Sequence, residues 1–161
     1  MARALAPDLF VSGDIPDTFE GRFESVTLHA ALVLRRMKAL PPPAADAAQE
    51  LVDRIFDGLD AAMRQVGVSD VAVPKRIKAF AQGFYGRLAA YDEALGAAAP
   101  EDRMAEALAR NVLEGRPCPP WLARHAVAMA AGLDGCDLAG LTGGRLPQLQ
   151  RGATHGGGTH V

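Results

Sequence analysis

Histidine, cysteine and carboxylate side chains could in principle hold a metal ion here, but their spacing does not suit one. A di-iron or di-manganese helical bundle needs E-x-x-H pairs that project inward from its helices. The residue three positions before His29 is Val26, and the residue three positions before His125 is Leu122. Zinc sites commonly use C-x-x-C pairs, and the two cysteines of this chain form none. The sequence therefore predicts neither a metal site nor a cofactor.

Motifs of covalent and phosphate chemistry are also missing from the sequence. It contains no G-x-S-x-G nucleophile elbow, no phosphate-binding glycine loop and no dinucleotide fingerprint. Five carboxylates recur at three- and four-residue steps, but they lie opposite an apolar helix face and so indicate a solvated surface. These are Asp46, Glu50, Asp53, Asp57 and Asp60. We expect no enzymatic activity.

Length and composition indicate one soluble globular domain. The chain has 161 residues, 49% hydrophobic and 22% charged, with a net charge of −2. That charge gives no overall attraction to nucleic acid or anionic membranes, so any such affinity must come from a local patch. The most apolar segment, VTLHAALVLRRM, is too short to span a membrane, and the start, MARALAPDLF, lacks the apolar stretch expected of a signal peptide. We expect a cytoplasmic protein with reduced cysteines, at most peripheral at the inner face of the membrane.

Apolar residues at helical spacing predict a first long helix over residues 17–38. Asp17 is the expected N-cap, with Glu20 as its capping-box partner, and the prolines at 41–43 end the segment. One face is expected to be buried. It comprises Phe19, Phe23, Val26, Ala30, Val33 and Met37.

Two further long helices follow, over residues 44–66 and 73–95. The first ends at Gly67, a natural C-terminal stop, and the second has Pro74 in its first turn. The expected apolar stripe of the first is Leu51, Val52, Ile55, Phe56, Leu59, Ala62, Met63 and Val66. That of the second is Ile77, Phe80, Phe84, Leu88, Tyr91 and Leu95. Inward aromatics, chiefly Phe19, Phe23, Phe56, Phe80 and Phe84, should fix the core.

Two shorter helices should begin near Pro100 and Pro120, and a glycine-rich remainder after Gly135 predicts a turn and then a flexible tail. Their expected inward residues are Met104, Leu108 and Val112, then Leu122, Ala126, Met129 and Leu133. The fold class is therefore all-α: an irregular single-domain helical bundle of five or more helices over residues 1–144, with a flexible C-terminal tail over 145–161.

The helix over 73–95 carries its charges against its own dipole. Lys75, Arg76 and Lys78 lie near its N-terminus, while Asp92 and Glu93 lie near its C-terminus. Two explanations are open. A short connection makes this helix an antiparallel neighbour of the preceding one, so the lysines could pair with the carboxylates at 57 and 60. Alternatively, the cations form a basic surface for an anionic partner.

Histidine, tyrosine and tryptophan side chains are candidate functional groups, but each also has a structural explanation. His29 borders an apolar helix face, which favours a histidine hydrogen-bonded inside the bundle. Tyr85 and Tyr91 are more typical of core residues with a bonded hydroxyl than of ligand contacts. Trp121 could be a packing anchor or a partner-facing aromatic. The basic segment lacks interleaved aromatics, which argues against base stacking and specific DNA binding.

Three segments together resemble, in order, the ubiquinol–cytochrome c reductase assembly chaperone family, the bacterial relatives of the mitochondrial cytochrome b assembly factor. They are IPDTFEGRFESVTLHAALVLRRMK, GVSDVAVPKRIKAFAQGFYGRLAAYDEAL and the stretch from MAEALARNVLEGRP to LAGLTGG. The most specific positions are P-D-T-F at 16–19, L-H at 28–29, R-M at 36–37 and F-Y-x5-Y-D at 84–92. The chain departs from mitochondrial members at Gly21–Arg22 and Ala30–Ala31.

This resemblance implies a non-enzymatic chaperone that binds newly made cytochrome b, with a generic helical adaptor or regulatory domain as the alternative. A second small assembly factor and the ribosome are partners of mitochondrial members and remain open here. The residues proposed to contact partners are Arg35, Arg36, Lys38, Lys75, Arg76, Lys78 and Tyr85. The family-motif positions expected to be structural are Pro16, Asp17, Phe19, His29, Phe84, Tyr91 and Asp92.

Overall fold

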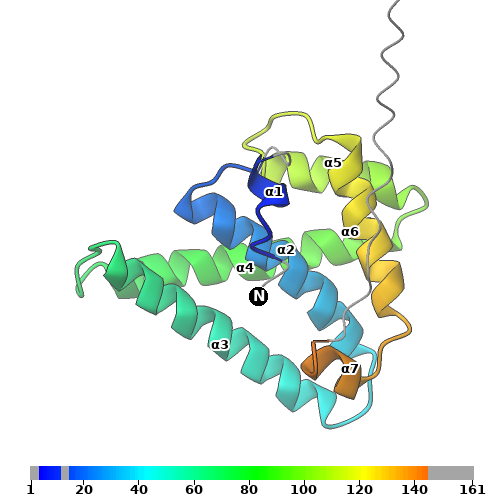
Figure 1. Cartoon of the computed structure of the whole chain (residues 1–161), viewed down its shortest axis with the longest axis horizontal. Helices are drawn as coiled ribbons and strands as arrows, with labels where there is room; N and C mark the ends of the chain where they lie inside the picture. The colour runs from blue at the N-terminus through cyan, green and yellow to red at the C-terminus, as the bar shows by residue number, and fades with distance from the viewer. Residues whose placement is uncertain (1–3, 12–14, 145–161) are drawn as a thin grey trace, which may run out of the picture.

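The computed structural model describes residues 4–11 and 15–144, and every regular element in that part of the chain is a helix (Figure 1). The all-α prediction is confirmed. The elements are α1 (Asp8–Val11), α2 (Phe19–Lys38), α3 (Ala44–Gln65), α4 (Val73–Gly96), α5 (Pro100–Asn111), α6 (Pro120–Leu133) and α7 (Leu138–Thr142). The predicted tail over 145–161 lies outside the described residues.

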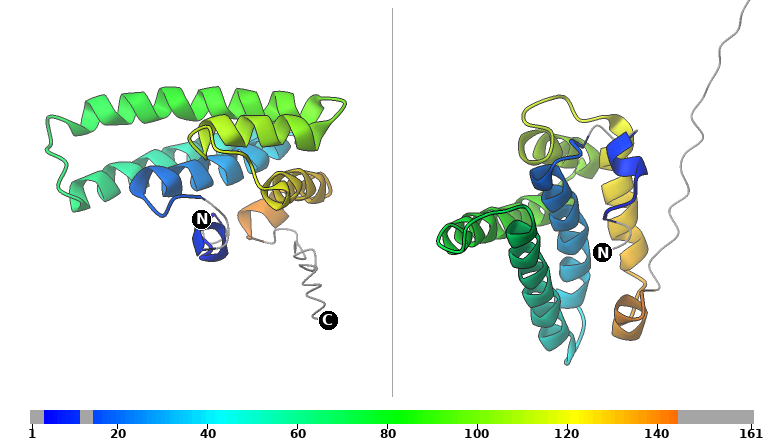
Figure 2. Two further views of the ribbon diagram at one scale, coloured as in Figure 1. Left: turned by 90° about the horizontal axis from the view of Figure 1, so that it is seen from above. Right: turned by 60° about the vertical axis from the view of Figure 1, so that its left-hand side comes forward.

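Helix α2 lies at the centre of the fold, with α4 on one side and α1 and α6 on the other (Figure 2, left). Eleven of its residues are buried, so the single apolar face predicted for it is too narrow. Small and polar side chains such as Ser25, Thr27 and Ala31 are buried beside Leu28 and Leu32. A helix packed on several sides has no wide polar face, so the spacing of its apolar residues underestimates how much of its surface is buried.

The start of α2 differs from the capping-box prediction. Thr18, not Asp17, is the N-cap, and its Oγ1 accepts a hydrogen bond of 3.0 Å from the Gly21 amide. Asp17 instead pairs with Arg22 at 2.7 Å. Threonine serves this position well because its hydroxyl satisfies one of the unpaired first-turn amides.

Helices α3 and α4 run in opposite directions and diverge from the loop over 66–72 (Figure 1). The periodic positions of α3 are buried or half-buried as predicted, except Val66, which is 67% exposed. Gly67 adopts the positive φ of 84° that ends the helix. Across the pair, the rings of Phe56 and Phe84 meet edge to face with centroids 5.4 Å apart.

Helices α5 and α6 begin at the predicted prolines, and all of their predicted inward residues are buried. Together with α2 and α4 they enclose the largest apolar cluster, which includes Leu28, Tyr91, Leu108 and Leu122. A second cluster joins α2, α3 and α4, and a third joins α2 to α6 and α7. Because α2 contributes to all three, it organises the whole bundle.

The short helices α1 and α7 were not predicted, since four or five residues are too few for a periodic pattern. Neither Cys118 nor Cys136 forms a disulfide with a described residue. No helix in the described ranges is long and apolar enough to cross a membrane. Within the same residues, no cluster of three histidine, cysteine or carboxylate side chains could hold a metal ion.

Candidate partner-binding surfaces

The basic start of α4 makes no ion pair within the described chain. Lys75, Arg76 and Lys78 are all exposed, and none takes part in a salt bridge with a described residue. Pairing of the lysines with the carboxylates at 57 and 60 is therefore wrong. Asp60 is engaged by Arg64 of its own helix at 2.7 Å. The helix dipole consequently opposes three uncompensated cations, at about 0.3–1 kcal/mol for each one in the first turn.

The acidic end of α4 is compensated internally. Arg35 of α2 donates to the Asp92 carboxylate at 3.0 Å and also lies 3.7 Å from Asp134, just beyond α6. Arg36 donates to the backbone carbonyl of Cys136 at 2.9 Å. These two arginines tie α2 to α4 and to the end of α6, and their role as partner contacts stays a prediction. The structural role predicted for Asp92 agrees with this contact.

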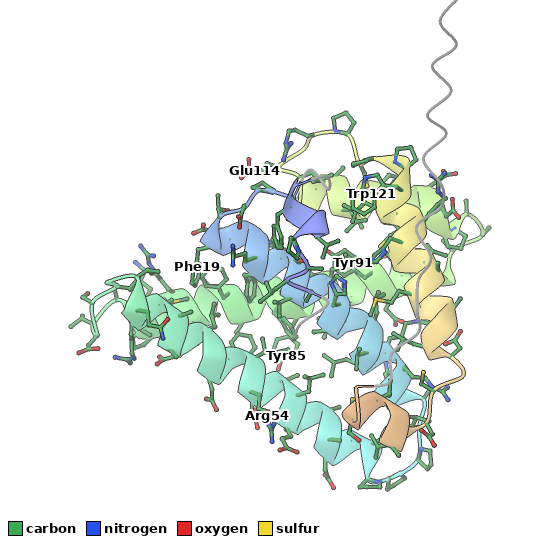
Figure 3. All side chains as sticks on the ribbon, viewed as in Figure 1. Phe19, Arg54, Tyr85, Tyr91, Glu114 and Trp121 are labelled. Carbon is green, nitrogen blue, oxygen red and sulfur yellow. The ribbon has the colours of Figure 1, made fainter. Side chains whose placement is uncertain are left out.

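Two other predicted contact residues remain available to a partner. Lys38 is exposed on the rim of a shallow depression that Arg35 and Arg36 also line. Tyr85 is 55% exposed on α4 (Figure 3). Its ring meets that of Phe84 edge to face, with centroids 5.5 Å apart. The prediction of Tyr85 as a core residue is wrong, because it lies one position past the buried stripe of α4.

The P-D-T-F motif shapes the entry to α2. A Cβ atom at Gly21 would lie only 1.9 Å from the Pro16 carbonyl oxygen, so only glycine permits this close approach of the backbone. Phe19 of the motif is half-buried and meets Phe80 of α4 edge to face at 5.9 Å. The smaller residue at 21, noted as a departure from mitochondrial members, thus has a local structural reason.

His29 has the structural role predicted for it. It is buried, and its Nδ1 lies 2.8 Å from the backbone carbonyl of Ser25. Its ring lies 5.8 Å, centroid to centroid, from that of His125 on α6, which in turn packs against Trp121. Trp121 is half-buried against the largest apolar cluster, which favours a packing anchor over a partner-facing ring.

A buried polar cluster joins the two long central helices and was not predicted. Arg87 of α4 donates a hydrogen bond to the Glu24 carboxylate of α2, and both side chains are largely removed from water. Burial raises the pKa of Glu24, against the opposing effect of Arg87. Tyr91, beside this pair, is buried among α2, α4 and α6 (Figure 3), and burial raises the pKa of its hydroxyl. The sequence signal for this pair is weak. Glu24 directly follows the predicted core residue Phe23, and Arg87 directly precedes Leu88.

An apolar groove also lies outside the sequence predictions. It opens between the first half of α2 and the second half of α3, where the two helices diverge (Figure 1). Its volume is about 240 Å³. Phe19, Phe23 and Val26 line one side, Leu59 and its neighbours on α3 line the other, and Arg22 is the charged residue in the lining. Two edge-to-face contacts of the phenylalanines with Phe80 fix the shape of this surface.

Comparison with known proteins identifies the family. The sequence model described as ubiquinol-cytochrome C chaperone matches residues 12–140, which is most of the chain. The chain belongs to the ubiquinol-cytochrome C chaperone family. No curated protein matches the chain by sequence.

A solved structure supports membership of this chaperone family. The crystal structure of the Cbp3 homolog from Brucella abortus superposes with a TM-score of 0.80 at 33% sequence identity. The match covers 92% of this chain and 83% of that chain. The described part of the chaperone therefore has the architecture of that protein, and the recognition made from the sequence motifs is confirmed.

Proposed function

We propose that this chaperone binds newly made cytochrome b and holds it, without chemistry, during assembly of ubiquinol–cytochrome c reductase. The observation that carries the proposal is the family match over residues 12–140. As a member of that family the chain is an assembly chaperone for the reductase. Its client and its mode of binding are the parts that we propose.

The groove between α2 and α3 is the best supported client site. An unassembled membrane protein presents apolar side chains that must be shielded from water, and contiguous exposed apolar surface commonly marks an interaction site. The groove is smaller than the roughly 300–1,000 Å³ of pockets that enclose a whole small molecule. It is better suited to one or two large apolar side chains of a peptide segment than to a cofactor or substrate.

Tyr85 and Lys38 are proposed as secondary contacts for a partner protein, such as a second small assembly factor. Tyrosine is favoured at interfaces because it combines a large apolar ring with a polar hydroxyl. Tyr85 lies on an exposed face of α4. No observation in the structure favours the generic adaptor over the assembly chaperone.

A deletion strain tests the proposal. Loss of the chaperone should lower cytochrome b haem absorbance and ubiquinol–cytochrome c reductase activity, while other respiratory complexes keep their levels. Complementation should use the wild type, Gly58→Gln and Gly96→Gln. A Cβ atom at either glycine meets no atom within 4 Å, so neither change creates an internal clash.

Of these two glycines, Gly58 lines the groove and Gly96 does not, so Gly58→Gln should fail to restore the reductase and Gly96→Gln should restore it. Normal reductase in the deletion strain would contradict the proposed function. Full rescue by Gly58→Gln would contradict the client site alone.

A further inference from the structure

The loop between α3 and α4 forms an apolar tip. Val66 is 67% exposed and Val71 is 91% exposed. The loop lies at the end of the molecule farthest from α5 and α6, with the two long helices converging on it (Figures 1 and 2). Such β-branched aliphatic side chains gain free energy when they leave water, and no described part of the chain covers them.

Three cations at the start of α4 follow this loop and make no ion pair with a described residue. Between positions 60 and 78 the chain carries four cations and two carboxylates, although its net charge is −2. Arg64 engages both carboxylates, Asp60 at 2.7 Å and Asp70 in a second contact. The three cations of α4 therefore have no carboxylate partner among the described residues, which distinguishes this end of the helix from its acidic end, where Arg35 compensates Asp92.

We propose that this lipid-binding tip, comprising Val66, Val71, Lys75, Arg76 and Lys78, docks the chaperone on the surface of an anionic lipid bilayer. The valines enter the boundary between headgroups and acyl chains, and the cations contact lipid phosphates. The loop projects at the end of the two long helices (Figure 1) and combines apolar side chains with cations, as a deformable interface requires.

An anionic bilayer explains more of these features than the other anionic surfaces do. RNA phosphates would attract the cations but give the valines no apolar environment. A folded acidic protein would need a concave surface to receive a projecting loop. The tip lies at the C-terminal end of α3, opposite the prolines that precede this helix, and docking by the tip does not depend on the identity of the client.

Vesicle flotation with the full-length chain tests the proposal. Wild type should float with phosphatidylcholine vesicles that contain about 30% phosphatidylglycerol and should not float with pure phosphatidylcholine. The bound fraction should fall as salt rises, because the Debye length shortens to about 3 Å at 1 M. Absence of binding to the anionic vesicles at low salt would overturn the proposal.

Three variants separate the two halves of the tip from general charge effects. Lys75→Gln/Arg76→Gln/Lys78→Gln should lower the partition coefficient by about 100-fold, since each cation near an anionic leaflet contributes roughly fivefold. Val66→Ser/Val71→Ser keeps the charge and should lower it by about 10-fold.

The matched control, Arg103→Gln/Arg110→Gln/Arg124→Gln, removes the same charge from exposed positions on α5 and α6. Its loss should be at most about fivefold. An equal loss in the control, or no loss in the valine variant, would overturn docking by this tip.

A spectroscopic probe reports insertion directly. Val71→Trp in a Trp121→Phe background places the single tryptophan of the chain on the loop. Its emission should shift to the blue with anionic vesicles and should be quenched by brominated acyl chains. Emission that stays unchanged while the protein floats would overturn insertion. Binding of an RNA duplex by the same tip, tighter than its binding to anionic vesicles at the same salt concentration, would assign the surface to RNA instead.

Discussion

Arg87 on α4 and Glu24 on α2 form a salt bridge where the two central helices cross, with side chains only 22% and 11% exposed. Burying both charges is costly, and their hydrogen bond offsets part of that cost. Burial still raises the pKa of Glu24, so its charged form remains less favourable here than in water. The pair joins α2 to α4, and the same helix α2 carries Phe19 and Phe23, which line the groove.

This pair should make stability depend on pH in a specific direction. Because the native pKa of Glu24 lies above 4.5, the folded state binds this proton more tightly than the unfolded chain does. Its stabilising contribution is full below pH 4.5 and is lost as the pH rises through the raised native pKa. The free energy of unfolding of wild type minus that of Glu24→Gln should therefore fall as pH rises from 4.5 and then level off.

Urea unfolding across a pH series measures that difference. Glu114→Gln makes the same chemical change at an exposed position and is the matched control. If the difference in unfolding free energy between wild type and Glu24→Gln does not change with pH, Glu24 is more hydrated than its burial indicates.

Phe84 should be the costliest single truncation in α4. It is 0% exposed and packs against Phe56 of α3, so Phe84→Ala removes apolar burial and leaves a cavity, at about 3–5 kcal/mol of unfolding free energy. Tyr85→Ala, at the next position but 55% exposed, should cost less than about 1 kcal/mol. Thermal and urea unfolding of the two variants compare them directly, and similar losses would show that α4 is rotated from its described position.

The Tyr91 hydroxyl is buried, and no described residue forms a hydrogen bond with it. An unpaired buried polar group costs about 1–3 kcal/mol, so Tyr91→Phe should leave the protein equally stable or raise its unfolding free energy by about 1 kcal/mol. The measurement is the urea midpoint at constant slope. A loss above about 1 kcal/mol would show that the hydroxyl is hydrogen-bonded in solution.

The triple glutamine variant of Lys75, Arg76 and Lys78 should be more stable than wild type. No internal ion pair is lost, whereas the unfavourable interaction with the α4 dipole is relieved, by about 1 kcal/mol in total. Glutamine has nearly the helix propensity of lysine and arginine, so the backbone contributes little to the change. A melting temperature below that of wild type would mean that these cations have partners within the chain.

Much of the fold could be predicted because the long helices bury periodic apolar stripes and are interrupted at prolines and glycines. The buried face of α6, from Leu122 to Leu133, follows directly from that pattern. The pattern fails for α2, because a central helix buries residues such as Ser25 and Thr27 that periodicity assigns to solvent.

The candidate surfaces were harder to predict, because which cations are free depends on tertiary pairing. Arg35 and Lys75 are both cations in helical sequence, yet one is held by Asp92 and the other has no ion-pair partner among the described residues. The groove depends on the angle at which α2 and α3 diverge, and that angle cannot be predicted from the spacing of apolar residues within either helix. Only the resemblance of ordered motifs pointed from the sequence to the family.

Site-specific photocrosslinking during synthesis of cytochrome b tests the central claim most directly. A benzoylphenylalanine probe would replace Ala62, which lines the groove, or Arg110, which is exposed on α5. The account predicts that the probe at Ala62 crosslinks to cytochrome b, that Gly58→Gln weakens this product, and that the probe at Arg110 gives none. Crosslinking of cytochrome b from Arg110 but not from Ala62, or from neither position, would contradict it.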